Sequence, residues 1–98
     1  MKTASWGLNM KAVITVIGRD SVGIIAKVSG KCSEHGVNIL DITQKVFSET
    51  FAMIMLADCT GCMLPFGEFV DVMNGLGKEN NLEIHTTRED IFNSMHRI

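Results

Sequence analysis

A strand, a turn and a helix follow one another in the stretch that decides the fold, Lys11-Ala-Val-Ile-Thr-Val-Ile-Gly-Arg-Asp-Ser-Val-Gly-Ile-Ile25. Alternate side chains of a strand point to opposite faces, and both sets in residues 11–18 are largely apolar. A strand that is apolar on both faces belongs in the middle of a sheet. Beyond the turn at 18–23, apolar residues with helical spacing predict a helix over 22–35 that ends at Gly36.

Two further strands follow this helix. Residues 37–47 alternate between apolar and polar, and the alternation slips at Ile39 and Leu40, which predicts a bulge between Asn38 and Asp41. A turn then leads into residues 51–58, which are apolar on both faces. This third strand should therefore also be central.

The last part of the chain predicts a helix, an edge strand and a short helix. Pro65 stands where a helix begins, because the first helical position tolerates a missing N–H. Residues 82–87 alternate with one polar face, which is typical of an edge strand. Thr86 and Glu89 fit a capping box before a short amphipathic helix with apolar residues at 91, 92, 95 and 98.

The resulting order is β-α-β-β-α-β with an added C-terminal helix. We therefore predict an α+β fold, a ferredoxin-like sandwich with a four-stranded antiparallel sheet. In this plan the first and third strands lie in the middle, and these are the two strands that are apolar on both faces. The agreement supports the topology, because the strand faces were assigned before the plan was considered.

The chain is short for the number of apolar side chains that it has to bury. It has 98 residues, of which 46% are hydrophobic, and its mean hydropathy is +0.20. A chain of this length forms one domain. The two long helices cover one face of the sheet, so the C-terminal helix and a second subunit are expected to cover the other. We therefore predict a homodimer.

The net charge and the composition of residues 1–9 indicate which partners and which cellular compartment to expect. The net charge is -2 and the isoelectric point about 5.8, which argues against nucleic acid as a partner. No apolar run is long enough for a membrane helix, so no membrane partner is expected. Residues 1–9 lack the apolar core of a signal peptide and indicate a tail or an over-called start. The single domain is thus placed at 10–98, in the cytoplasm.

The turn at 18–23 is the first candidate site. Unpaired N–H groups and the dipole at a helix N-terminus attract anions, and Gly23 allows a ligand close to the backbone. Asp20 can accept a hydrogen bond from an ammonium group, so the turn matches an α-amino acid. Asn38 both donates and accepts, which also suits a zwitterion. The alternative is that Asp20 or Ser21 caps the helix and that Asn38 supports a turn.

A family resemblance rests on the same residues. The stretch 11–29, with Gly23-Ile-Ile closing its loop, and the sequence His35-Gly-Val-Asn-Ile-Leu-Asp-Ile-Thr-Gln44 resemble an ACT domain. The ending Arg88-Glu-Asp-Ile-Phe-Asn-Ser-Met-His-Arg-Ile98 is similar to that of short stand-alone ACT proteins of bacteria and archaea.

The resemblance covers residues 10–98 and implies binding of small effectors, commonly amino acids, at a subunit interface. It also implies that subunits pair side by side into a larger sheet. By position it places Asp20, Val22, Gly23 and Ile24 in the effector loop, with Asn38 as the polar residue beside it. No enzyme is attached to the domain here, so the resemblance implies a free-standing sensor or a subunit that docks on a client protein.

Two other classes remain as alternatives. Cys59-Thr-Gly-Cys62 is a C-x-x-C that can hold a soft metal or form a redox pair, although a zinc site would need two more ligands. Acylphosphatases share the fold class and pair an arginine with an asparagine, which Arg19 and Asn38 superficially match. We expect neither, and so predict a regulatory module that is not an enzyme, with no catalytic residue, no metal and no cofactor.

Overall fold

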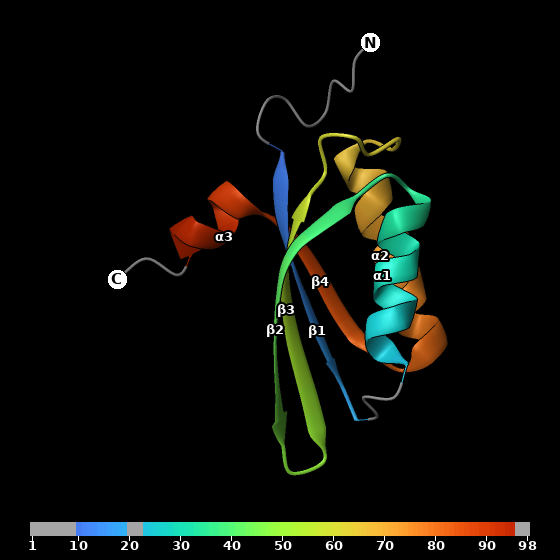
Figure 1. Cartoon of the computed structure of the whole chain (residues 1–98), viewed down its shortest axis with the longest axis vertical. Coiled ribbons are helices and arrows are strands. Elements are labelled where there is room, and N and C mark those ends of the chain that lie inside the picture. Colours follow the sequence, from blue (N-terminus) through green and yellow to red (C-terminus); the bar gives the residue numbers. More distant parts are fainter. Residues whose placement is uncertain (1–9, 20–22, 96–98) are drawn as a thin grey trace.

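The computed structural model describes residues 10–19 and 23–95. Its elements follow the expected order (Figure 1), and they are β1 (Lys11–Gly18), α1 (Ile24–Glu34), β2 (Asn38–Phe47), β3 (Thr50–Asp58), α2 (Phe66–Asn80), β4 (Glu83–Arg88) and α3 (Glu89–Met95). Among the described residues, no helix is long and apolar enough to cross a membrane.

The four strands form one antiparallel sheet in the order β2-β3-β1-β4. This order confirms that the two strands with apolar faces on both sides, β1 and β3, are central. The predicted bulge is also confirmed, because the pairing of β2 with β3 shifts register between Ile39 and Asp41. The fold is therefore the ferredoxin-like α+β sandwich that the sequence predicts.

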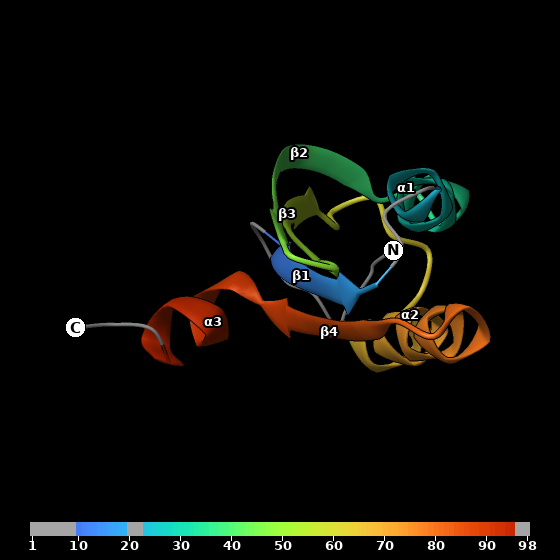
Figure 2. The ribbon, with the colours of Figure 1, turned by 90° about the horizontal axis from the view of Figure 1, so that it is seen from below.

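The core lies between the sheet and the two long helices, α1 and α2, which both cover the same face (Figure 2). Alternate residues of β1 and β3 point into it, and Ile14 and Met55, which lie opposite each other, are both fully buried. Val28 and Cys32 of α1 and Phe69 of α2 close the core from the helix side at 0% exposure.

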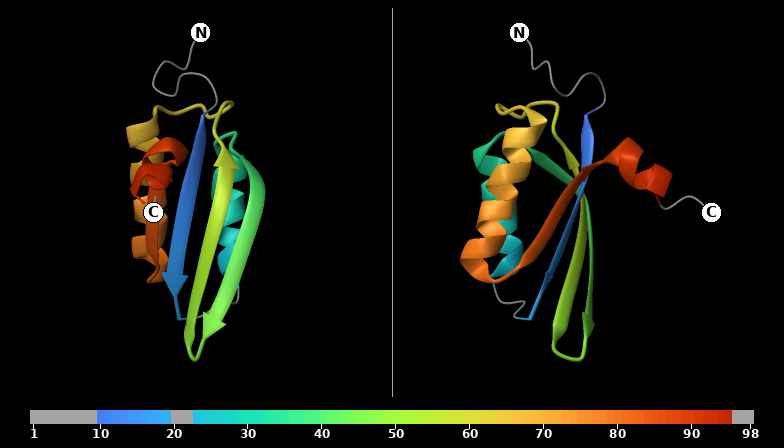
Figure 3. Two further views of the ribbon diagram at one scale, coloured as in Figure 1. Left: turned by 90° about the vertical axis from the view of Figure 1, so that its left-hand side faces the viewer. Right: turned by 180° about the vertical axis from the view of Figure 1, so that it is seen from behind.

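The other face of the sheet is apolar along its two central strands and only partly covered. We call this the open face, and its central residues are Val13 and Ile17 of β1 and Ile54 and Leu56 of β3. Helix α3 lies on this side, opposite α1 and α2, and contacts β1 and β4 (Figure 3). Val13 is 6% exposed, whereas Ile17 is 43% and Ile54 is 47% exposed. The C-terminal helix thus covers part of the open face, as expected, and leaves one end bare.

The start of α3 differs from the expectation. A capping box at Thr86 and Glu89 is wrong, because pairing with β1 extends as far as Arg88 and holds Thr86 in β4 opposite Ile14. The Thr86 hydroxyl is buried without a hydrogen-bond partner among the described residues. The first turn of α3 is held instead by Asp90, whose carboxylate accepts the Ile91 N–H at 2.9 Å and pairs with the Arg88 guanidinium at 3.0 Å.

Candidate functional site

The turn between β1 and α1 ends at Gly23, whose backbone conformation only glycine adopts easily. Gly23 has φ 79° and ψ -7°, in the left-handed region, and it occupies the N-cap position of α1. Gly23 therefore takes the N-cap position, and capping by the Asp20 or Ser21 side chain stays a prediction. Asp20, Ser21 and Val22 lie outside the described residues. Ile24, only 3% exposed, packs into the core and fixes the first turn of the helix.

This helix N-terminus is suited to an anionic group. The first N–H groups of a helix have no intrahelical acceptor and carry the positive end of the helix dipole. No acidic side chain stands in the first turn of α1 to satisfy that charge. The Lys27 amine adds a cation, since its Nζ lies 3.9 Å from where a β-carbon on Gly23 would sit. Lys27 is not among the ligand-binding residues predicted from the sequence. The sequence pattern that could have identified it is a basic residue one helical turn after the loop glycine.

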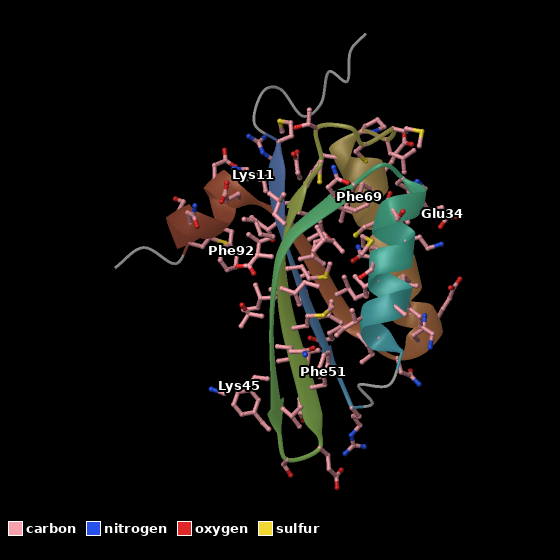
Figure 4. The ribbon with its side chains drawn as sticks, viewed as in Figure 1. Lys11, Glu34, Lys45, Phe51, Phe69 and Phe92 are labelled. Carbon is pink, nitrogen blue, oxygen red and sulfur yellow. The ribbon has the colours of Figure 1, made fainter. Side chains whose placement is uncertain are left out.

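A shallow groove of about 440 Å³ begins beside this turn. It is lined by Ile25 of α1, by Gln44, Lys45 and Val46 of β2, and by Phe51 of β3. The Phe51 side chain faces the helices and the Lys45 side chain faces away from them (Figure 4). We call this the edge groove, because β2 is an edge strand and the groove is open along it.

Asn38 does not lie beside the turn in the same chain. It is the exposed first residue of β2, and it pairs with Asp58 at the end of the sheet where α1 finishes. Gly23 is at the other end of α1, which has 11 residues. A helix of this length spans about 16 Å, and Figure 1 shows α1 running back from the end of β1 to the start of β2. Gly23 and Asn38 of one chain therefore cannot hold the same small ligand.

The same separation keeps Arg19 and Asn38 of one chain from forming the arginine–asparagine pair of an acylphosphatase. Arg19 follows the end of β1, near Gly23, and its guanidinium lies 3.6 Å from the Glu49 carboxylate. Both side chains are more than 80% exposed. Asn38 is at the far end of the sheet, so the arginine and the asparagine do not meet in one site.

The C-x-x-C belongs to the core. Cys59, Cys62 and Cys32 are free thiols, each at most 1% exposed. The Cys62 N–H donates to the Cys59 carbonyl at 2.9 Å, which closes a turn between them. Burial, with a smaller contribution from Cys62, raises the pKa of Cys32 to about 11. Burial, followed by Cys62, Cys32 and Asp58, raises the pKa of Cys59 to about 12.

These thiols are poorly suited to chemistry at neutral pH. The thiolate is the nucleophile and the metal ligand, and a raised pKa disfavours it. Among the residues that the structure describes, no group of three or more histidines, cysteines or carboxylates is placed to hold a metal ion.

Comparisons with known proteins agree with this architecture. The family model of the ACT domain matches residues 11–86. The UPF0237 protein of Listeria innocua is 43% identical over 89 residues, 91% of this chain and 100% of the relative. The UPF0237 protein of Clostridium perfringens is 46% identical over the same shares.

Solved structures give the same result. The ACT domain protein from Streptococcus pneumoniae is 38% identical, with a TM-score of 0.76 over 85% of this chain and 93% of that one. The regulatory subunit of aspartate kinase from Thermus thermophilus, at 24% identity, shares the fold with a TM-score of 0.61 over 80% of this chain and 50% of that one.

The sheet order and the two helices on one face accompany the match of residues 11–86 to the ACT domain. ACT domains are regulatory domains that bind small ligands. The chain belongs to this family, and its full-length relatives are the UPF0237 proteins.

Proposed function

We propose that this protein is a small regulatory module that binds an amino acid or a similar small zwitterion between two copies of the chain. One observation carries the proposal: the N-terminus of α1 at Gly23 offers N–H donors, a helix dipole and the nearby Lys27 amine, with no acidic side chain in the first turn. These groups together suit a carboxylate. The side chain of Asp20 would meet the ammonium group of the same ligand.

The interface follows from the placement of Asn38. β2 is an edge strand whose residues 40–47 are all exposed, and an exposed edge is a template for pairing with another strand. Antiparallel pairing of β2 with β2 of a second copy places the two α1 helices antiparallel as well. The start of β2 in one copy then lies toward the start of α1 in the other. Asn38 of the second copy would thus complete the site at Gly23.

Each residue then has a definite role. The backbone N–H groups of Val22, Gly23 and Ile24 bind the carboxylate of the ligand. Asp20 accepts a hydrogen bond from its ammonium group, and Asn38 of the second copy donates to or accepts from the remaining polar atoms. The edge groove beside Ile25 receives the ligand side chain.

The bound ligand favours one assembly over another, which is a population shift. The two copies share each site, so the ligand stabilises the pair more than the separate chains. A client protein that recognises only the paired form would then respond to the ligand. No turnover of the ligand is expected, because the turn holds donors for a carboxylate and the thiols are buried.

The first test is thermal unfolding of the protein with each of the twenty amino acids. A ligand at about 100 times its dissociation constant adds about 2.7 kcal/mol to the free energy of unfolding. For a domain of this size the unfolding temperature rises by roughly 10–20 °C. Asp20→Ala should abolish the shift without changing the ligand-free unfolding temperature, whereas Asp71→Ala on the exposed side of α2 should keep the shift. An unaltered shift in Asp20→Ala would refute the role of Asp20.

The second test asks whether two copies share each site. Pairs made only of Asp20→Ala chains, or only of Asn38→Ala chains, have no complete site. A mixed pair has one site with both residues intact and one with neither. Mixing the two variants should therefore restore binding at about half of the mixed pairs' sites, as measured by titration calorimetry. If mixing restores nothing, the ligand site does not join two copies in this way.

A further inference from the structure

Side-by-side pairing through β2 leaves the open face of the sheet uncovered. Such pairing joins two sheets edge to edge, so the open faces of both copies stay on the same side, away from the helices. Exposure rises along β1 from 6% at Val13 to 43% at Ile17, and Ile54 of β3 is 47% exposed. On the same face the register places Glu83 and His85 of β4 and Lys45 and Phe47 of β2 beside these residues. An apolar surface of this kind with polar residues around it marks an interaction site.

Helix α3 carries a second uncovered surface next to the first. Ile91 and Met95 are one helical turn apart and therefore share one side of α3, where they are 48% and 62% exposed. Phe92 is half-buried and lies between α3 and the strands (Figure 4). The helix thus has one side toward its own sheet and another apolar side toward solvent.

The geometry of α3 does not let it cover the bare end of its own sheet. It has seven residues, which span about 10 Å, and it leaves the end of the sheet where β4 finishes and stands away from it (Figure 3). A helix this short is not stable by itself in water and depends on packing of its apolar side chains. Its own sheet supplies packing on one side.

We propose that the open face binds the open face of a second copy, with α3 of each copy packed over the bare end of the other sheet. Each chain has one uncovered sheet end and one uncovered helix side, both on the same side of the molecule. A two-fold axis that lies between the sheets, roughly across the strands, brings α3 from the covered end of one sheet to the bare end of the other. Each apolar surface then covers its counterpart, as an isologous contact requires.

The area reaches the lower limit for such a contact. Four strands spaced about 4.8 Å apart and about 26 Å long have a face on the order of 500 Å² per copy. Helix α3 covers part of this face in its own chain, and in the contact the exposed side of α3 takes the place of that part. Two copies therefore offer on the order of 1,000 Å² in all, which is the lower limit for a specific interface. This face contact is separate from the β2 edge, so the two interfaces together would join four copies.

A cross-linking experiment tests the contact directly. Two single variants, Ile17→Cys and Met95→Cys, are mixed and treated with a short bismaleimide. The native thiols are buried, so the wild-type protein serves as the background. We expect a linked pair of one chain of each kind. A mixture of Ile17→Cys with Met63→Cys is the matched control, since Met63 is 72% exposed but lies in the loop before α2. Equal linking in both mixtures, or none in either, overturns the proposal.

The mass of the assembly gives an independent readout. The double variant Ile91→Glu, Met95→Glu places charges on the exposed side of α3 and should leave the unfolding temperature of the single chain nearly unchanged. Light scattering should show the assembly falling to half its mass, from four copies to two. Ligand-induced thermal stabilisation should persist, because the β2 edge is untouched. An unchanged mass of the double variant refutes the face contact. If no amino acid raises the unfolding temperature of the wild-type protein, the proposed function is refuted and the face contact is not affected.

Discussion

At the scale of single residues, Gly36 is the clearest constraint on the chain. It has φ 80° just after α1, and its N–H and that of Val37 bond back to Ser33 and Cys32 at 3.1 and 2.9 Å. These bonds form a Schellman ending. A β-carbon on Gly36 would lie 2.5 Å from the Gly61 carbonyl oxygen. The glycine therefore allows both the helix ending and the close approach of the C-x-x-C loop.

We expect Gly36→Ala to destabilise the protein by at least about 1–2 kcal/mol, because alanine is strained in the left-handed region and also meets Gly61. Gly30→Ala is the matched control. Gly30 lies inside α1 with nothing within 4 Å of an added β-carbon, so alanine there should stabilise the protein by about 0.5–1 kcal/mol. Urea unfolding measures both. Equal effects of the two substitutions would contradict this account.

The candidate site could be predicted at this scale only in part. The residues of the turn indicate a helix N-terminus for an anion, and Gly23 and Ile24 do lie there. Sequence alone does not show that Asn38 is remote from Gly23, because the 14 positions between them fold into a helix that carries the chain to the far end of the sheet. Proximity in sequence and proximity in space differ here by the length of α1.

At the scale of elements, three buried free thiols lie where α1 and the loop between β3 and α2 enter the core. Cys32 comes from the helix, and Cys59 and Cys62 from the loop. Burial raises the pKa of Cys32 from 9.0 to about 11, so the folded protein holds the thiol proton more tightly than the unfolded chain does. Stability from this proton is fully present below pH 9 and is lost as pH rises through about 11.

We therefore expect the free energy of unfolding to fall between pH 9 and pH 11. Cys32→Ala should be less stable at neutral pH, because it loses a buried side chain, and should lose less stability over the alkaline range. The chain has no tyrosine, so thiolate absorbance can be followed without phenolate beside it. Parallel pH profiles for the two proteins would mean that Cys32 does not titrate with folding.

The elements themselves were the most predictable part of the molecule. Two-sided apolarity placed β1 and β3 in the centre, and a slip in alternation located the bulge in β2. The boundary between β4 and α3 was less predictable. Thr86 fits a capping motif locally, but pairing with β1 holds it in the strand. A long-range ladder overrides a local motif, and only the fold reveals the ladder.

At the scale of the whole molecule, apolar surface remains exposed on two sides: along the edge strand and on the open face. Leu40 and Val46 of β2 are 50% and 63% exposed, and Ile17, Phe47 and Ile54 mark the open face. The hydropathy of the chain predicted such an excess, but not its division between two surfaces. That division requires the register, which assigns each apolar residue to a face.

Assembly through these surfaces makes thermal stability depend on protein concentration, because mass action favours the folded, associated state. We expect the unfolding temperature to rise over a dilution series of the wild-type protein. Ile54→Thr keeps a β-branched side chain in β3 but removes apolar surface from the open face, so its unfolding temperature should depend less on concentration. Met63→Thr changes an apolar residue that is even more exposed, in the loop before α2, and should retain the wild-type slope. A wild-type unfolding temperature that is independent of concentration would mean that the folded protein is a monomer whose apolar surfaces serve a different partner.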